Sequence, residues 1–162
     1  MKIKVFTTGG SIDKAYSTQS SSFEVGEPQV ASILCDANAA FEYEIEPLLR
    51  KDSLEITPAE RAALVDRVRS DPHHYILITH GTDSMIATGL ALADIPGKVI
   101  VLTGAMQPAE FRHTDAHFNL GGAITALQTL PEGVYIVMNG QVFDPQYAKK
   151  NLAQNRFETR SR

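Results

Sequence analysis

Two glycine-containing segments of the sequence carry the side chains that acyl transfer requires. They are residues 8–12 (TGGSI) and residues 80–84 (HGTDS). Together they offer the hydroxyls of Ser11 and Thr82, the carboxylate of Asp83, and backbone amides that glycine leaves accessible. Such groups can attack an amide or ester carbonyl and stabilise the oxyanion that forms. The two segments therefore predict a hydrolase that depends on hydroxyl side chains.

Each segment taken alone also has an ordinary structural interpretation. Gly9 and Gly10 could form a tight turn in which Ser11 is only a turn residue. Thr82 and Asp83 could be N-terminal residues that cap a following helix. The catalytic interpretation depends on both segments lying at the same edge of one sheet.

Nucleotide and metal sites find less support. The sequence has no GxxxxGK[ST] phosphate loop, and residues 9–11 lack the third glycine of a dinucleotide fingerprint. His113 and His117 are four residues apart, but no Glu accompanies them in a His-Glu-x-x-His pattern. Asp115, between them, is expected to cap the next helix. We therefore expect neither a metal nor a cofactor.

Alternating strands and helices are predicted to bring the two segments together. Apolar runs predict strands at residues 3–8, 42–48, 75–79, 98–103 and 133–138, and helical periodicity predicts helices at 57–68, 83–92 and 116–130. The helix at 57 opens with Thr57-Pro58-Ala59-Glu60, which is typical of a capping box. The order predicts a three-layer α/β/α, doubly wound, mainly parallel sheet of Rossmann or flavodoxin type. Ligands bind such sheets at the carboxyl ends of the strands, where both segments lie.

Two further segments bear on the site and on assembly. Residues 13–23 are polar and rich in serine, and we interpret them as either a mobile lid or a disordered loop. The helix at 83–92 is apolar on nearly every face, so we expect it to be buried on both sides, with a subunit interface covering its outer side. This predicts a homo-oligomer, a dimer or a tetramer.

Composition limits the class of protein. The 162 residues, 43% hydrophobic and 21% charged, are appropriate for one domain over residues 1–162. A net charge of −4 argues against nucleic-acid binding. The first residues lack the apolar run of a secretion signal, and no segment approaches the ~20 apolar residues of a membrane span. Cys35, the single cysteine, is expected to be buried, and we expect a soluble cytoplasmic protein without membrane contact.

The motifs resemble those of the bacterial-type L-asparaginases. Residues 7–12 (TTGGSI) and 78–85 (ITHGTDSM) are similar to the paired motifs of that family, and 104–108 (GAMQP), 118–120 (FNL) and 137–139 (VMN) follow in its order. The resemblance runs over essentially the whole chain. It implies that the protein is an amidohydrolase with L-asparagine as its small-molecule substrate.

The resemblance also implies roles for individual residues. Ser11 corresponds to the nucleophile, and Thr82, Asp83 and Lys150 correspond to a triad. Lys149 is the alternative if the match is shifted by one residue. Lys150 could also be an ordinary surface lysine. A lysine acts as a base only when its ammonium loses its proton near neutral pH, which burial favours. Other positions are implied in substrate binding, through side chains or backbone: Ser53, Asp52, Gly10, Gly81, Ala105 and Met106.

The sequence departs from the family in two places besides the serine at position 11. Full-length members carry a C-terminal domain that is absent after residue 162, so the chain is either a short single-domain member or a fragment. The family uses a lid tyrosine where this chain has Phe23, and Tyr16 is our candidate for supplying the phenol.

The predicted function is hydrolysis of L-asparagine to L-aspartate and ammonia, with glutaminase activity as a weaker second activity. The alternative is a catalytically weak regulatory module that binds asparagine or aspartate. A third possibility is the glutaminase-like part of a transfer-RNA amidotransferase, but the sequence shows no basic patch to support it.

Overall fold

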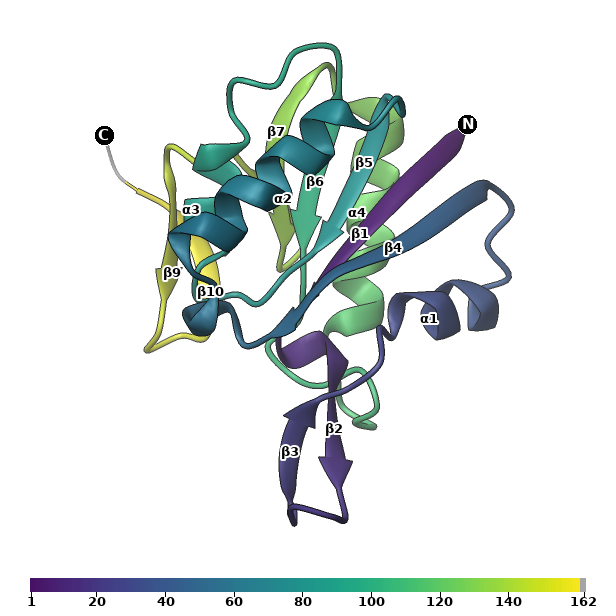
Figure 1. Cartoon of the computed structure of the whole chain (residues 1–162), viewed down its shortest axis with the longest axis vertical. Helices are drawn as coiled ribbons and strands as arrows, with labels where there is room; N and C mark the ends of the chain where they lie inside the picture. The colour runs from purple at the N-terminus through teal and green to yellow at the C-terminus, as the bar shows by residue number, and fades with distance from the viewer. Residues whose placement is uncertain (161–162) are drawn as a thin grey trace.

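A six-stranded, mainly parallel sheet forms the centre of the protein in the computed structural model, which describes residues 1–160 (Figure 1). The strand order is β4-β1-β5-β6-β7-β8, and only β8 runs antiparallel to its neighbour. The bounds are β1 (Lys2–Gly9), β4 (Glu42–Lys51), β5 (Tyr75–Thr79), β6 (Val99–Thr103), β7 (Gly133–Met138) and β8 (Gln141–Phe143). All five predicted strands are confirmed.

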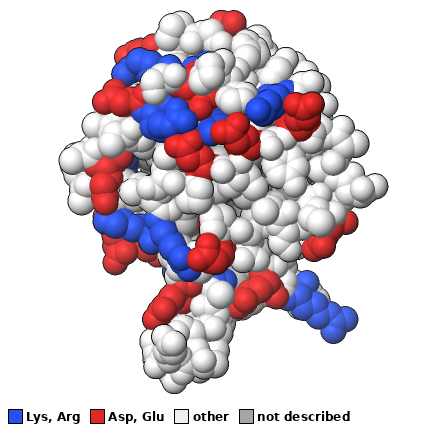
Figure 2. Space-filling view, turned by 45° about the vertical axis from the view of Figure 1, so that its right-hand side comes forward, with Lys and Arg blue, Asp and Glu red and all other residues white. Residues whose placement is uncertain are grey.

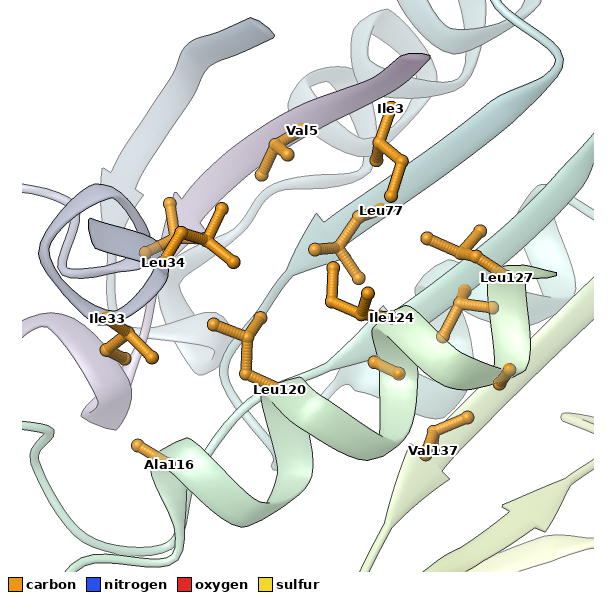
Figure 3. Packing of buried hydrophobic residues seen from close by; sticks show 14 of the residues in the cluster. Ile3, Val5, Ile33, Leu34, Leu77, Ala116, Leu120, Ile124, Leu127 and Val137 are labelled. Atoms are coloured by element: carbon orange, nitrogen blue, oxygen red, sulfur yellow. The ribbon is translucent and has the colours of Figure 1, made fainter. Parts of the chain in front are cut away.

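Helices cover both faces of this sheet, as the doubly wound prediction requires. They are α1 (Val30–Asp36), α2 (Pro58–Ser70), α3 (Met85–Ala91) and α4 (Ala116–Thr129). One core joins the sheet to α1 and α4, and Figure 3 shows Leu120 and Ile124 of α4 facing Leu77 of β5. The other core joins the opposite face to α2 and α3. Because β6 is buried along its whole length, its continuous apolar sequence has partners on both sides. The predicted fold class is confirmed.

The start of α2 follows its sequence signature. The Thr57 hydroxyl accepts a hydrogen bond from the Glu60 amide at 3.2 Å, and the Glu60 carboxylate accepts one from the Thr57 amide at 2.9 Å. Pro58 occupies the first helical turn, where its missing N–H costs nothing. The predicted capping box is confirmed.

Two local predictions are corrected, and a third is not tested by the single chain. The third helix begins at Met85, so Thr82 and Asp83 lie in the turn before it and do not cap it. The outer side of this helix, which a subunit interface is predicted to cover, is exposed in the single chain, with Leu90 46% accessible, and the oligomer stays a prediction. Cys35 is exposed because helical periodicity turns Val30, Ile33 and Leu34 of α1 inward.

Several short elements lie outside the central sheet. The serine-rich segment, expected to be a lid or a disordered loop, forms an ordered hairpin of β2 (Lys14–Ser17) and β3 (Ser22–Val25) that projects from the body (Figure 1). A second ribbon pairs β9 (Ala148–Asn151) with β10 (Arg156–Thr159). Single 3-10 turns follow two strands, η1 (Ser11–Asp13) and η2 (Ser53–Glu55). No helix among residues 1–160 has the length and apolar character needed to cross a membrane.

Counting only the five parallel strands, their order is 2-1-3-4-5. Strands are therefore added on both sides of β1. The connection that leaves β1 contains α1 on one face of the sheet, and the connection that leaves β5 contains α3 on the opposite face. In folds of this type ligands bind at the switch point, outside the carboxyl ends of the two strands.

Candidate active site

Three loops touch at the switch point through positions without bulky side chains. A Cβ on Gly10, which has φ 84°, would lie 2.4 Å from the Gly81 Cα, so the backbones after β1 and β5 are in direct contact. A Cβ on Gly81 would lie 2.6 Å from the Ser53 Cβ, after β4. The predicted residues Gly10, Gly81 and Ser53 are therefore brought together, and the two glycines permit the close approach.

Lys150 meets Thr82 and Asp83 beside this contact. Its Nζ donates to the Thr82 Oγ1 at 2.8 Å and to the Asp83 Oδ1 at 2.6 Å. Thr82 is 6% exposed, and the side chains of Lys150 and Asp83 are 16% and 40% exposed. A hydroxyl, an ammonium and a carboxylate therefore form one partly solvated cluster.

The β9–β10 ribbon presents Lys150 to this cluster. Phe157, across the ribbon from Lys150, is fully buried, and its amide donates to the Asn139 Oδ1 at 2.9 Å. The neighbouring Lys149 pairs instead with Glu158 at 3.5 Å and is 47% exposed. Of the two lysines considered, only Lys150 contacts Thr82.

Ser11 opens η1 immediately after Gly10, so the contact between Gly10 and Gly81 sets it next to the Thr82 loop. Its side chain is partly exposed, and its hydroxyl takes part in no hydrogen bond with residues 1–160. A free hydroxyl at a ligand-accessible edge is available for attack on a substrate.

Two of the backbone amides at positions expected in substrate binding are already occupied. The Gly10 amide donates to the Lys51 carbonyl at 2.9 Å, and the Met106 amide donates to both oxygens of Asp115. Within the described part of the chain, the amides of Ser11 and Thr82 donate to no acceptor. These two, one on each touching loop, are the better candidates for an oxyanion site.

Ser53 and Asp52 lie at the end of β4. Ser53 is 2% exposed, and its Oγ accepts the Ser84 amide at 3.2 Å, which leaves the hydroxyl proton free to donate. Asp52 accepts the Leu54 amide at 3.1 Å and pairs with Lys14 at 3.1 Å. The Leu54 hydrogen bond lowers the pKa of Asp52, and the charges of Lys14 and Lys150 act in the same direction. Lys14, which sequence reasoning missed, thereby ties the hairpin to the site.

The structure does not bring Tyr16 to the Lys150 cluster. Tyr16 is 53% exposed on the hairpin, edge-on to Phe23 with ring centroids 5.6 Å apart. Phe23 in turn meets Phe111 at 5.4 Å. The catalytic role of Tyr16 stays a prediction, and it requires the hairpin to move.

Asp115 occupies the N-cap position of α4 but does not cap it, contrary to expectation. Its carboxylate instead accepts the amides of Met106 and Gln107 and the side chain of Asn119 at 2.8 Å. Ala105, in the same loop, is 1% exposed and packs in the core. The loop after β6 is therefore rigid beside the site, a feature that only the long-range contacts reveal.

Asp13 is a buried carboxyl two residues after Ser11. Its Oδ1 accepts the Gln29 amide at 2.9 Å, and its backbone carbonyl accepts the Gly26 amide at 2.7 Å, so it fastens the base of the hairpin. Burial raises the pKa of Asp13 to about 7, although the Gln29 hydrogen bond and the Arg50 charge oppose the shift.

Two hollows of the surface lie away from the Lys150 cluster. Grooves of about 530 and 400 Å³ flank α4 and have mostly apolar linings. No group of three or more His, Cys, Asp or Glu residues within 1–160 is arranged to hold a metal. On the face seen in Figure 2, basic and acidic side chains are interleaved and do not segregate by sign.

Comparison with known proteins relates the chain to one family. The family model described as "Asparaginase, N-terminal" matches residues 2–161. The L-asparaginase of Thermococcus kodakarensis is 31% identical over 152 residues, 88% of this chain and 45% of that protein. The D subunit of the glutamyl-tRNA(Gln) amidotransferase of Methanococcus vannielii is 38% identical over 74 residues, 43% of this chain and 17% of that protein. The solved thermostable L-asparaginase of Thermococcus kodakarensis superposes with a TM-score of 0.86 at 28% identity, over 98% of this chain and 51% of that one. The chain spans about half the length of these L-asparaginases and less of the amidotransferase protein.

Proposed function

The chain belongs to the asparaginase family, and from this we propose that it hydrolyses L-asparagine to L-aspartate and ammonia, with glutaminase activity as a weaker second activity. The contact of Lys150 with Thr82 and Asp83, next to the loop of Ser11, is the observation that carries the proposal. The Thr82 hydroxyl and the carboxylate of this cluster and the free hydroxyl of Ser11 follow strands at the sheet edge where ligands bind, and the lysine meets the first two there.

In the proposed mechanism Ser11 attacks the side-chain amide carbon of asparagine. The Ser11 proton passes through Thr82 to Lys150, which must first be neutral and accept a hydrogen bond where the ammonium now donates one. The amides of Ser11 and Thr82 hold the oxyanion. The C–N bond then breaks, and the nitrogen takes the proton back from Lys150 and leaves as ammonia. Ser11 is left as an ester, which water hydrolyses to L-aspartate.

The substrate's charged groups find complementary partners in the same cluster. Asp83 uses one oxygen for Lys150, and its Oδ2 makes no hydrogen bond within residues 1–160, so it is free to accept the α-ammonium group. The Ser53 proton can be donated to the α-carboxylate. Each such charge-assisted hydrogen bond contributes about 1.5–3 kcal/mol.

A second candidate comes from the similarity to the amidotransferase protein of Methanococcus vannielii. Under it the chain would be part of a glutamyl-tRNA(Gln) amidotransferase. The net charge of −4 and the interleaved charges in Figure 2 do not favour direct contact with RNA. L-Glutamine therefore enters the test as a competing substrate.

The test measures ammonia release from L-asparagine, D-asparagine and L-glutamine by the wild type, Ser11→Ala and Thr82→Val. We expect turnover of L-asparagine by the wild type and its loss in both variants. Activity that survives Ser11→Ala but not Thr82→Val would make Thr82 the nucleophile. No turnover of any amide, combined with binding of L-aspartate, would replace the enzyme by a regulatory binding module.

We also propose that the protein assembles as a homo-oligomer through the exposed apolar side of α3, where Ala87, Leu90 and Ala91 face solvent. Sedimentation of the wild type against Leu90→Glu tests this. A monomer in both samples would exclude it.

A further inference from the structure

A chain of hydrogen bonds runs from the outer helix α2 to the loop of Thr82. Arg61, partly buried on α2, donates from its Nε to the Thr88 Oγ1 at 3.1 Å. The Thr88 Oγ1 lies 2.8 Å from the His80 Nε2, and the His80 Nδ1 lies 2.7 Å from the Gly81 carbonyl oxygen. His80 and Thr88 are both fully buried, so these polar atoms have no access to water.

The proton positions in this chain follow from its two ends. A guanidinium can only donate, so the Thr88 oxygen accepts from Arg61 and its own proton goes to the His80 Nε2. A carbonyl can only accept, so the His80 Nδ1 must carry the ring proton. Burial lowers the pKa of His80 to about 4, and the charge of Arg61 acts in the same direction against the Gly81 hydrogen bond. One neutral tautomer, protonated at Nδ1, is therefore compatible with both ends.

A second arm, which is a path of hydrogen bonds through Ser84, leads from Arg61 to Ser53. The Arg61 Nη2 donates to the Ser84 Oγ at 3.3 Å, and the Ser84 hydroxyl donates to the Ser53 carbonyl at 2.7 Å. The Ser84 amide meanwhile donates to the Ser53 Oγ. Ser84 is thus bonded to both polar groups of Ser53 and to the arginine.

We propose that Arg61 is a positioning residue that fixes both halves of the site from behind. One arm ends on the Gly81 carbonyl, in the peptide group that leads into Thr82. The other ends on Ser53, the proposed anchor of the substrate carboxylate. Arg61 itself does not touch substrate and acts through Thr88, His80 and Ser84. Its effect on turnover rests on the proposed function, but its effect on loop order does not.

Nitrogen-15 NMR of the histidine rings and amide hydrogen exchange test the positioning without any activity. The variants are Arg61→Met, Thr88→Val and, as a conservative rescue, Thr88→Ser. The control is Arg69→Met, because Arg69 is exposed on the same helix and, among residues 1–160, pairs only with Asp66. We expect His80 in the wild type to be protonated at Nδ1 alone. Exchange at the amides of His80 and Ser84, which donate to the Thr103 carbonyl and the Ser53 Oγ, should rise about fivefold to tenfold in Thr88→Val and Arg61→Met. This matches the loss of one hydrogen bond of ordinary strength. Thr88→Ser and Arg69→Met should behave as the wild type.

Kinetics with L-asparagine, well below the melting temperature of the least stable variant, supply the second readout. We expect kcat to fall about tenfold in Thr88→Val, from misplacement of Thr82. In Arg61→Met we expect KM to rise as well, because Ser53 loses its support. A ring protonated at Nε2, or unchanged exchange and kinetics in both variants, would overturn the inference. If the wild type hydrolyses no amide, the proposed function fails, and the ring tautomer and the exchange rates alone decide the positioning.

Discussion

Replacing Asp13 by asparagine should make the protein more stable at alkaline pH. Asp13 is 2% exposed, and burial raises its pKa from 3.8 to about 7 in the folded state. The difference of about 3 units corresponds to roughly 4 kcal/mol at about 1.36 kcal/mol per unit. Because the folded-state pKa is the higher one, the stabilisation by the protonated carboxyl is complete below about pH 3.8. It is lost as the pH rises through 7.

The assay is urea unfolding of the wild type and Asp13→Asn at several pH values from 5 to 8. Asparagine keeps an oxygen to accept the Gln29 amide but carries no charge at any pH. The unfolding free energy of the wild type should therefore fall relative to the variant by about 2.5 kcal/mol between pH 5 and pH 8.

The control is Asp36→Asn, which removes an exposed carboxylate from α1. Its effect should stay within about 0.5 kcal/mol at every pH, as is usual for a surface substitution. If the difference between the wild type and Asp13→Asn is the same at pH 5 and pH 8, the reasoning is refuted. Asp13 then titrates in the folded protein as it does in the unfolded chain.

Substitutions at three further residues test the site, two of them with a matched control. Lys150→Met should lower the rate of ammonia release by a factor of about 10²–10⁴, the contribution of a positioned acid or base, while Lys149→Met should leave it unchanged. Equal losses in the two variants would show that the contact with Thr82 is irrelevant. Gly10→Ala should lower both the melting temperature and activity because its Cβ meets the backbone after β5, whereas Gly121→Ala, in open space on α4, should raise stability by about 0.5–1 kcal/mol. Tyr16→Phe should lower turnover at an unchanged melting temperature, and full turnover would exclude the phenol from the chemistry.

The parts of the fold that local sequence determines could be predicted. Strands buried on both faces show as short apolar runs, and the start of α2 has a local signature in Thr57 and Glu60. The carboxyl-edge rule then places Ser11, Thr82 and Asp83 at one end of the sheet without further information.

What could not be predicted depends on contacts between distant residues. The hairpin of β2 and β3 has a polar sequence, and its order rests on the aromatic contacts of Phe23 and on the pair of Lys14 with Asp52. The chain from Arg61 to His80 joins residues 27 and 8 positions apart on different elements. Asp115 resembles a helix cap in sequence but binds the loop after β6, because two amides there need an acceptor. No local pattern encodes these pairings.

The packing of backbone against backbone at the switch point limits how this protein can be redesigned. Positions 10 and 81 have no room for a side chain, so most members of a random library that varies them would misfold. Leu54, beside Ser53, is 74% exposed, and Met106 is partly buried in the loop after β6. Both lie at the same edge of the sheet, and neither is held by the contact between the two glycines. Altered substrate preference should therefore be sought at these two positions, where selection can act on pocket shape while the frame stays intact.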